Sequence, residues 1–155
     1  MKEIKVQLIH PEAKVPTKAY EGDLGWDFYI VDDETFNNSD QLRVPSYILG
    51  RGETKTFSTG VCLGLPEGYG MILKDRSSLA SKHSLHILAG VIDSSYVGQI
   101  LIVISNLGEK GLIMEKGMKI AQGILVPMIP SYMYPVKELK DSQRGQAGFG
   151  SSGNT

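Results

Sequence analysis

The sequence has few of the features that hold a chain together covalently or attach it to a membrane. Cys62 is the single cysteine among 155 residues, so no disulfide can form within the chain. A buried thiol in a reducing compartment is the simplest expectation. No apolar run approaches the ~18 residues that a membrane span needs, and residues 1–5 contain no apolar signal core. We therefore expect a cytoplasmic protein without a membrane partner.

Charge and aromatic residues are also sparse. Aromatic residues make up 8% of the chain. The formal net charge is -1, so the protein has no long-range electrostatic field that would attract nucleic acid, and we expect no nucleic-acid partner. An anionic ligand would have to be bound by a few placed cations. With 41% hydrophobic residues, the composition is that of one globular domain.

Short apolar runs separated by glycine and proline turns predict the fold. Alternating or β-branched runs at 4–8, 25–31, 55–65, 69–73, 100–104 and 120–126 favour strands. One short helix is expected after the possible N-caps Ser77 or Ser78. Residues 32–51 are polar and favour a long surface loop with at most one short strand. The pattern predicts an all-β sandwich or barrel with one short helix.

The segment 88–98 combines an acid and an aromatic residue with bounding glycines. It lies before the apolar run 100–104, which is typical of a hairpin whose turn has a function. Gly90 and Gly98 allow a positive φ and a close approach of a ligand to the backbone. From the residues alone, an aspartate such as Asp93 is more often a turn residue that binds its own backbone than a base, and a tyrosine such as Tyr96 is more often a half-buried sheet residue than a platform for a substrate.

Residues 141–155 differ from the rest of the chain because they have no apolar period. The segment contains Arg144, Phe149 and, after them, Gly150, Ser151 and Ser152. Guanidinium, backbone N–H and hydroxyl donors together suit a phosphate, although no Walker loop is present and a flexible glycine-serine tail is the alternative. We predict one domain over 1–140 and a flexible glycine-rich arm over 141–155.

Five short segments in this order resemble the motifs of the homotrimeric dUTPases, over nearly the whole chain. They are 19–28 (AYEGDLGWDF), 75–80 (DRSSLA), 90–98 (GVIDSSYVG), 116–122 (KGMKIAQ) and 144–153 (RGQAGFGSSG). The sequence departs from the usual motifs at Trp26, where tyrosine is usual, at Lys119, where arginine is usual, and at Ala147, where glycine is usual. The resemblance implies a distorted jelly roll of the β-clip type whose C-terminal arm closes over an active site in a neighbouring subunit. It also implies a homotrimer with shared active sites.

The resemblance further implies hydrolysis of dUTP to dUMP and pyrophosphate, with Mg²⁺ on the phosphates. Asp93 would be the general base, Gln122 a donor near the α-phosphate, and Asp27 would hold the hydrated Mg²⁺ through water. For Asp27, organising the turn 22–26 is the alternative. Tyr96 would pack under the deoxyribose. The other implied substrate-binding residues are Arg76, Ser77, Ser78, Ile87, Ala89, Gly90, Val91, Arg144, Phe149, Gly150, Ser151 and Ser152.

Two other functions are compatible with the same motifs. A dCTP deaminase shares the fold and an Arg-Ser-Ser segment, but it uses a glutamate near the base where this hairpin has Asp93. A regulatory protein could keep the nucleotide pocket as a switch for a protein partner. Production of ammonia from dCTP would indicate the first, and partner capture that depends on nucleotide would indicate the second.

Overall fold

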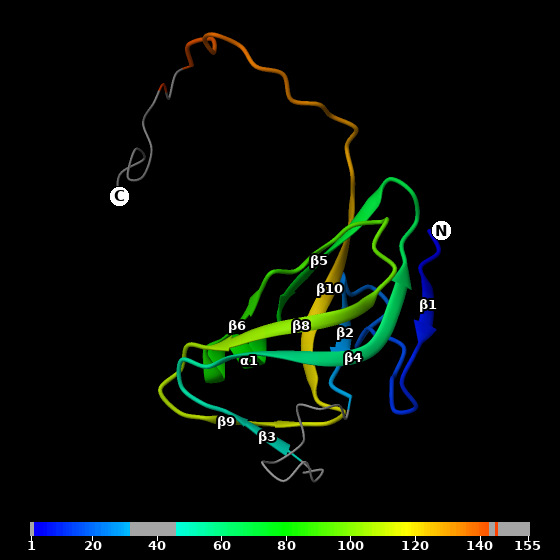
Figure 1. The fold of residues 1–155 in the computed structure, drawn as a ribbon, viewed down its shortest axis with the longest axis vertical. Coiled ribbons are helices and arrows are strands. Elements are labelled where there is room, and N and C mark those ends of the chain that lie inside the picture. The colour runs from blue at the N-terminus through cyan, green and yellow to red at the C-terminus, as the bar shows by residue number, and fades with distance from the viewer. Residues whose placement is uncertain (1, 32–45, 143–144, 146–155) are drawn as a thin grey trace.

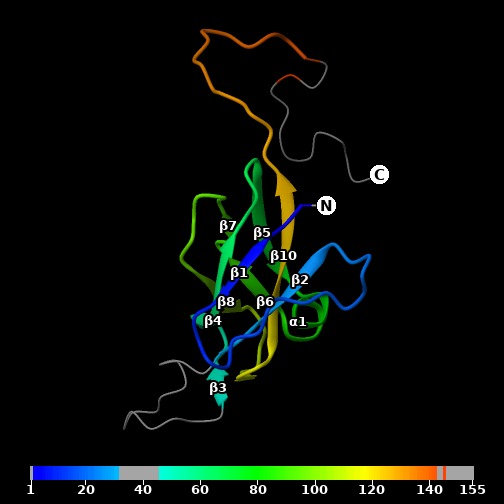
Figure 2. The same cartoon turned by 90° about the vertical axis from the view of Figure 1, so that its right-hand side faces the viewer.

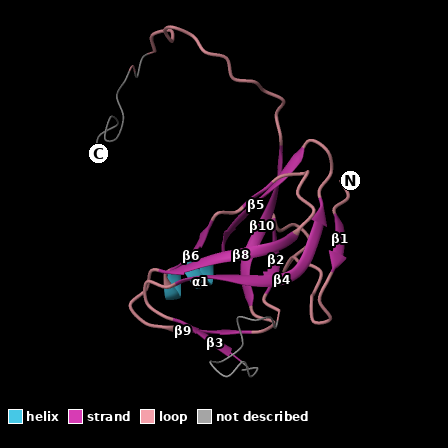
Figure 3. Cartoon of the chain, viewed as in Figure 1, coloured by secondary structure: helices cyan, strands magenta, loops and turns pink. Residues whose placement is uncertain are grey.

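The computed structural model describes residues 2–31, 46–142 and 145. In that part of the chain, strands account for nearly all regular structure (Figures 1 and 3). The elements are β1 (Lys5–Leu8), β2 (Gly25–Tyr29), β3 (Ser46–Leu49), β4 (Thr54–Gly64), β5 (Tyr69–Asp75), α1 (Ser77–His83), β6 (Leu85–Leu88), β7 (Val91–Ile92), β8 (Gln99–Asn106), β9 (Leu112–Glu115) and β10 (Lys119–Pro127). The predicted all-β fold with one short helix is confirmed.

Two antiparallel four-stranded sheets and a small strand pair make up the fold. The first sheet has the order β1-β4-β8-β6 and the second the order β2-β10-β5-β7, while β3 pairs with β9. All these pairings are antiparallel. Strand β3 lies within the stretch 32–51, where at most one short strand was expected.

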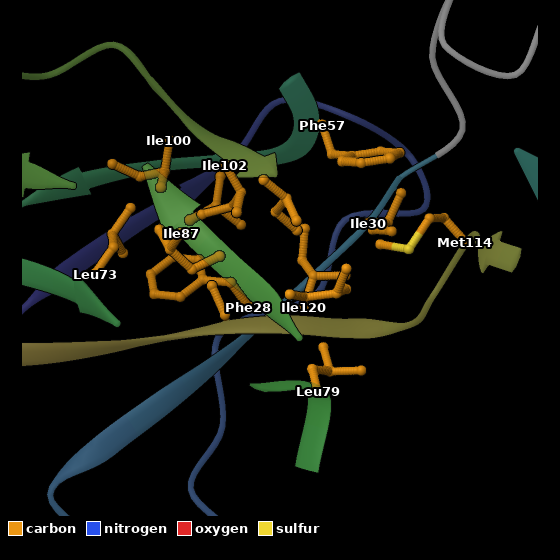
Figure 4. Packing of buried hydrophobic residues seen from close by; sticks show 14 of the residues in the cluster. Phe28, Ile30, Phe57, Leu73, Leu79, Ile87, Ile100, Ile102, Met114 and Ile120 are labelled. Carbon is orange, nitrogen blue, oxygen red and sulfur yellow. The ribbon is translucent and has the colours of Figure 1, made fainter. Parts of the chain in front are cut away.

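The core lies between the two large sheets, and β8 shows why. Ile100, Ile102 and Ile104 are fully buried, whereas the intervening Leu101 is 44% exposed, as the two-residue period of a strand requires. Figure 4 shows side chains of the core cluster, among them Ile87 and Ile102 from one large sheet and Phe28 from the other. Burial of these side chains provides the main free energy that holds the sheets together.

The predicted hairpin around 88–98 is only partly correct. Strands β6 and β8 pair as expected, with Leu88 opposite Val103. Between them, however, the chain crosses to the other sheet, where β7 pairs with β5. Gly90 has the expected positive φ of 118°, but Gly98 is not among the described residues with positive φ. At Gly98 a Cβ atom would lie 2.7 Å from the Tyr96 hydroxyl, so this glycine makes room for the ring.

Helix α1 begins one residue earlier than the serine caps predict. Its N-cap is Arg76, in extended conformation and without a side-chain cap, and the Arg76 carbonyl accepts the N–H groups of Leu79 and Ala80. The prediction of a serine cap is wrong, because Ser77 and Ser78 are the first two residues inside the helix. The helix ends at His83, and the C-cap residue Ser84 has a φ of 54°.

After β10 the chain leaves the sandwich as an extended segment, 128–142 (Figure 2). Large apolar side chains are exposed along it, among them Ile129, Tyr132 and Met133. Tyr132 and Tyr134 lie against each other with ring centroids 5.8 Å apart. In the described part of the chain, no helix is long and apolar enough to cross a membrane.

Candidate active site

A polar cavity of about 400 Å³ lies where β5 passes into α1, beside β2 and β10. Its walls contain Asp27, Arg76, Ser77, Ser78 and Gln122. The sequence separates these residues by up to 95 positions, and the pairing of β10 with both β2 and β5 brings them together. The structure therefore gathers the predicted phosphate ligands of the described chain, together with the predicted metal-binding acid.

Asp27 is ion-paired through both carboxylate oxygens. Its Oδ1 accepts a 2.9 Å hydrogen bond from Arg76 Nε, and its Oδ2 lies 2.8 Å from Lys119 Nζ. The hydrogen bond with Asp27 raises the pKa of Lys119. Asp27 is 8% exposed, so the two cations are what make a charged carboxylate acceptable at this depth.

The guanidinium of Arg76 is fixed in position by these contacts. Besides Nε, its Nη1 donates a 3.3 Å hydrogen bond to the carbonyl of Lys119. An arginine has five N–H donors, and its contacts with the described residues use two of them, which leaves three for an anion in the cavity. The arrangement suits a phosphate, because a fixed guanidinium loses little entropy when it binds one.

Gln122 reaches the same cavity from β10. Its Nε2 donates a 2.9 Å hydrogen bond to the backbone carbonyl of Asp75, so its contacts within residues 2–31 and 46–142 leave one amide N–H for another acceptor. A Cβ atom at Gly25 would lie 2.7 Å from Gln122 Oε1. The glycine of β2 therefore makes room for the Gln122 amide.

Asp93 lies in a different place. It is exposed and lines a second cavity, also about 400 Å³, with Val91, Tyr69, Val126 and other residues of β5, β7 and β10. Its carbonyl accepts the N–H of Tyr96 at 3.1 Å, as in a turn. The Tyr96 hydroxyl donates a 2.8 Å hydrogen bond to the carbonyl of Gln99, which fixes its half-exposed ring beside the turn.

The segment 87–91 is predicted to recognise uracil through its backbone N–H and C=O groups. Several of these groups already form hydrogen bonds within the protein. The Ile87 N–H donates a 2.6 Å hydrogen bond to Asp75 Oδ1, and the Gly90 carbonyl accepts from Leu73 N–H at 2.7 Å. Val91 pairs with Ile72. Among the described residues of this segment, Ala89 takes part in none of these backbone hydrogen bonds or strand pairings. It is exposed, and its φ is 58°. Base recognition by this segment stays a prediction, with Ala89 as its most accessible point.

The two cavities lie toward opposite ends of β5. Ile92, next to Asp93, pairs with Met71, whereas Arg76 follows the last residue of the strand. Arg76 is five positions beyond Met71, which corresponds to roughly 17 Å at about 3.4 Å per residue of strand. Figure 2 shows β7 and α1 apart along this sheet. In one chain, the carboxylate of Asp93 is therefore far from the Arg76 cavity.

Several predicted residues lie outside the described part of the chain: Arg144, Phe149, Gly150, Ser151 and Ser152. The described residues contain no group of three or more metal-ligating side chains. Conversely, the sequence reasoning missed Asp75 as a structural centre, although its position between a strand and the Arg-Ser-Ser segment was visible.

Comparisons with known proteins agree on one family. A family model described as dUTPase matches residues 43–153. The chain is 37% identical over 155 residues to the deoxyuridine 5'-triphosphate nucleotidohydrolase of Clostridioides difficile, covering 99% of each chain. It is 36% identical over 152 residues to the protein of the same name from Clostridium tetani, covering 97% of this chain and 96% of that one. The fold is similar to that of the Staphylococcus bacteriophage 80alpha dUTPase with dUPNHPP, at a TM-score of 0.78 and 27% identity, covering 99% of each chain.

Proposed function

The chain belongs to the dUTPase family and is a dUTP diphosphatase, and we propose that its reaction is attack of a water, deprotonated by Asp93, on the α-phosphorus of dUTP. This mechanism is supported by the presence of two features in the chain. One is a cavity with a fixed guanidinium, two serines and a glutamine. The other is an exposed carboxylate on a turn.

The proposed step balances as a hydrolysis. The water oxygen bonds to the α-phosphorus while its proton passes to the Asp93 carboxylate, and the bond from that phosphorus to the bridging oxygen of the β-phosphate breaks. dUMP and pyrophosphate leave. Arg76, Ser77 and Ser78 bind the phosphate oxygens, and the free N–H of Gln122 donates to an α-phosphate oxygen. These fixed donors stabilise the charge that builds up in the transition state.

We infer that each active site is assembled from two copies of the chain. Across roughly 17 Å of strand, Asp93 cannot deprotonate a water beside a phosphate bound by Arg76 of the same chain. A neighbouring copy would supply the second half of each site, in the homotrimer with shared sites that the family resemblance implies. The exposed apolar side chains of the segment 128–142 support association with a neighbouring chain.

The remaining proposed contacts concern the sugar, the base and the polyphosphate end. Tyr96, fixed by its bond to Gln99, would pack under the deoxyribose and exclude a 2′-hydroxyl. Ala89 and Gly90 would pair with uracil, and a cytosine would leave polar groups unpaired. In the arm, Phe149 would cover the base, while the γ-phosphate would bind Arg144, Gly150, Ser151 and Ser152.

The donor set also fits Mg²⁺ bound mainly through the triphosphate. A carboxylate has about four lone-pair positions, and Asp27 uses one on each oxygen for Arg76 and Lys119. The others can accept hydrogen bonds from a metal-bound water, which suits an ion that dehydrates reluctantly. When bound, the ion would neutralise phosphate charge.

Mixing two inactive variants tests the shared site. Arg76→Ala and Asp93→Asn are each expected to lose most activity alone. If they are refolded together in equal amounts, about a quarter of the sites combine two intact halves, so activity should return to about a quarter of the wild-type value. Mixing Asp93→Asn with the double variant is the control and must stay inactive. Absence of recovery in the first mixture would place both groups in one chain's site and overturn the proposal.

A regulatory role is the second candidate function. The similar dUTPase of phage 80alpha controls the transfer of virulence genes by a proto-oncogenic G protein-like mechanism. A nucleotide-dependent partner of this chain would be captured differently with and without dUpNHpp, and equal capture would argue against such a switch.

The names of the curated relatives favour hydrolysis of dUTP over deamination of dCTP. Measuring ammonia from dCTP would check this directly.

A further inference from the structure

The Asp75 side chain links the two large sheets next to the proposed active site. Its Oδ1 accepts the Ile87 N–H at 2.6 Å, so a carboxylate at the end of β5 binds the backbone of β6. Its Oδ2 lies 2.9 Å from His86 Nδ1. Burial favours the protonated carboxyl, but the hydrogen bonds from His86 and Ile87 and the charges of His86 and Lys74 together lower the pKa of Asp75.

This link and a second one enclose an unusual turn. From β5, Asp75 holds Ile87 before the turn, and Leu73 N–H holds the Gly90 carbonyl after it. Between them lies Ala89 with a φ of 58°, a left-handed conformation that is unfavourable for a residue with a Cβ atom. Such a conformation persists only where the surroundings impose it. Here β5 provides the anchors on both sides.

We propose that Asp75 is a positioning residue for base selectivity: by holding Ile87, it keeps Ala89 and Gly90 in the one backbone geometry that pairs with uracil. This inference rests on the proposed recognition of the base by that segment. Asp75 would not touch the substrate. A backbone that relaxes at Ala89 would offer its N–H and C=O groups in varied directions, and discrimination by unpaired polar groups requires fixed directions.

The side chain and the backbone of Asp75 have separable tasks. Its carbonyl accepts the Gln122 amide, and this contact does not depend on the side chain. Replacing the side chain should therefore disturb the base-pairing turn and leave the Gln122 contact in place. The consequence is a specific kinetic signature, in which selectivity changes more than kcat.

The test compares Asp75→Ala with Asp75→Asn. The asparagine keeps an oxygen that can accept from Ile87 N–H, whereas alanine removes it. We expect Asp75→Ala to lower the ratio of kcat/KM for dUTP to that for dCTP by about tenfold or more, with kcat for dUTP within about threefold of wild type. Asp75→Asn should restore most of the ratio. Glu67 is exposed in the turn that precedes the opposite end of β5, and Glu67→Gln is the matched control that should leave both the selectivity ratio and kcat unchanged.

A selectivity ratio within about twofold of wild type for folded Asp75→Ala, or an Asp75→Asn variant as impaired as alanine, would overturn the proposal. If the alanine variant does not fold, Asp75→Glu decides, because the displaced carboxylate should still lower selectivity. Amide hydrogen exchange of Ile87 and Ala89 in the ligand-free protein gives a second readout, with faster exchange expected in Asp75→Ala. Failure of the wild type to release pyrophosphate from dUTP would contradict the proposed function instead.

Discussion

Nε of Arg76 donates a 2.9 Å hydrogen bond to Oδ1 of Asp27, although β5 and β2 are separated by β10 in the sheet. The guanidinium also binds the Lys119 carbonyl on the intervening strand. One side chain thus ties together three strands and fixes the cation that faces the cavity.

Replacing Asp27 by asparagine should weaken this arrangement. The change removes the counter-charge of two cations, Arg76 and Lys119, and we expect a loss of about 1–3 kcal/mol in unfolding free energy. KM for dUTP should rise about tenfold because Arg76 is no longer oriented. Denaturant unfolding in EDTA measures the first effect without any contribution from a metal.

The control is Glu12→Gln, which removes an exposed ion pair of 3.7 Å with Lys116 and should cost at most about 0.5 kcal/mol. Unchanged stability of Asp27→Asn in EDTA, combined with an altered Mg²⁺ requirement, would instead assign Asp27 to the metal alone.

Replacing Asp93 by asparagine should abolish turnover but not binding. The amide cannot accept the proton of the attacking water, and we expect kcat to fall by about 10²–10⁴. Single-turnover kinetics and titration with dUpNHpp separate chemistry from affinity. A kcat close to wild type would remove Asp93 from the mechanism.

Gly98→Ala should alter sugar selectivity through Tyr96. A Cβ atom at this position would lie 2.7 Å from the Tyr96 hydroxyl, so the ring must move. We expect the preference for dUTP over UTP to fall by about tenfold. Gly22→Ala is the control, because its Cβ would meet nothing within 4 Å. An unchanged preference would mean that the sugar is sensed elsewhere.

The hydrogen bond between Tyr47 and Glu53 leads us to expect that the protein loses stability at high pH. This hydrogen bond, with burial and the Glu53 charge, raises the pKa of Tyr47 from 10.0 to about 12. Between these values the unfolded chain loses a proton that the native state keeps, so stability falls as pH rises through this window. Denaturant unfolding at pH 9 and 11 measures the fall. Tyr47→Phe should show a smaller fall, and an equal one would contradict the assignment.

Strands were predictable from apolar runs bounded by turn residues. The run 100–104 indicated a buried strand, and its isoleucines are fully buried, whereas Leu101 is 44% exposed. Strand β7 was not predictable in this way, because two residues are too few to show a period. The pairing of β7 with β5 depends on the tertiary packing of the chain, which a two-residue pattern does not show.

In the site, the motif resemblance named candidate residues but did not show which protein groups already bind them. The cavity that gathers Arg76 and Gln122 agrees with the motif resemblance. The Asp75 contact could not be read from the sequence, since its partner is a backbone N–H on a strand of the other sheet. Because every residue except proline has a backbone N–H, the residue type does not show which N–H the carboxylate binds.

The proposed division of each site between two copies, which rests on the distance along β5 between Asp93 and Arg76, would make activity depend on the abundance of the protein. Under that proposal, a lone chain has no complete catalytic centre. Specific activity should then decline on dilution, as subunits dissociate, even though every chain stays folded. A cell that lowers the amount of this protein would lose dUTP hydrolysis more steeply than it loses protein.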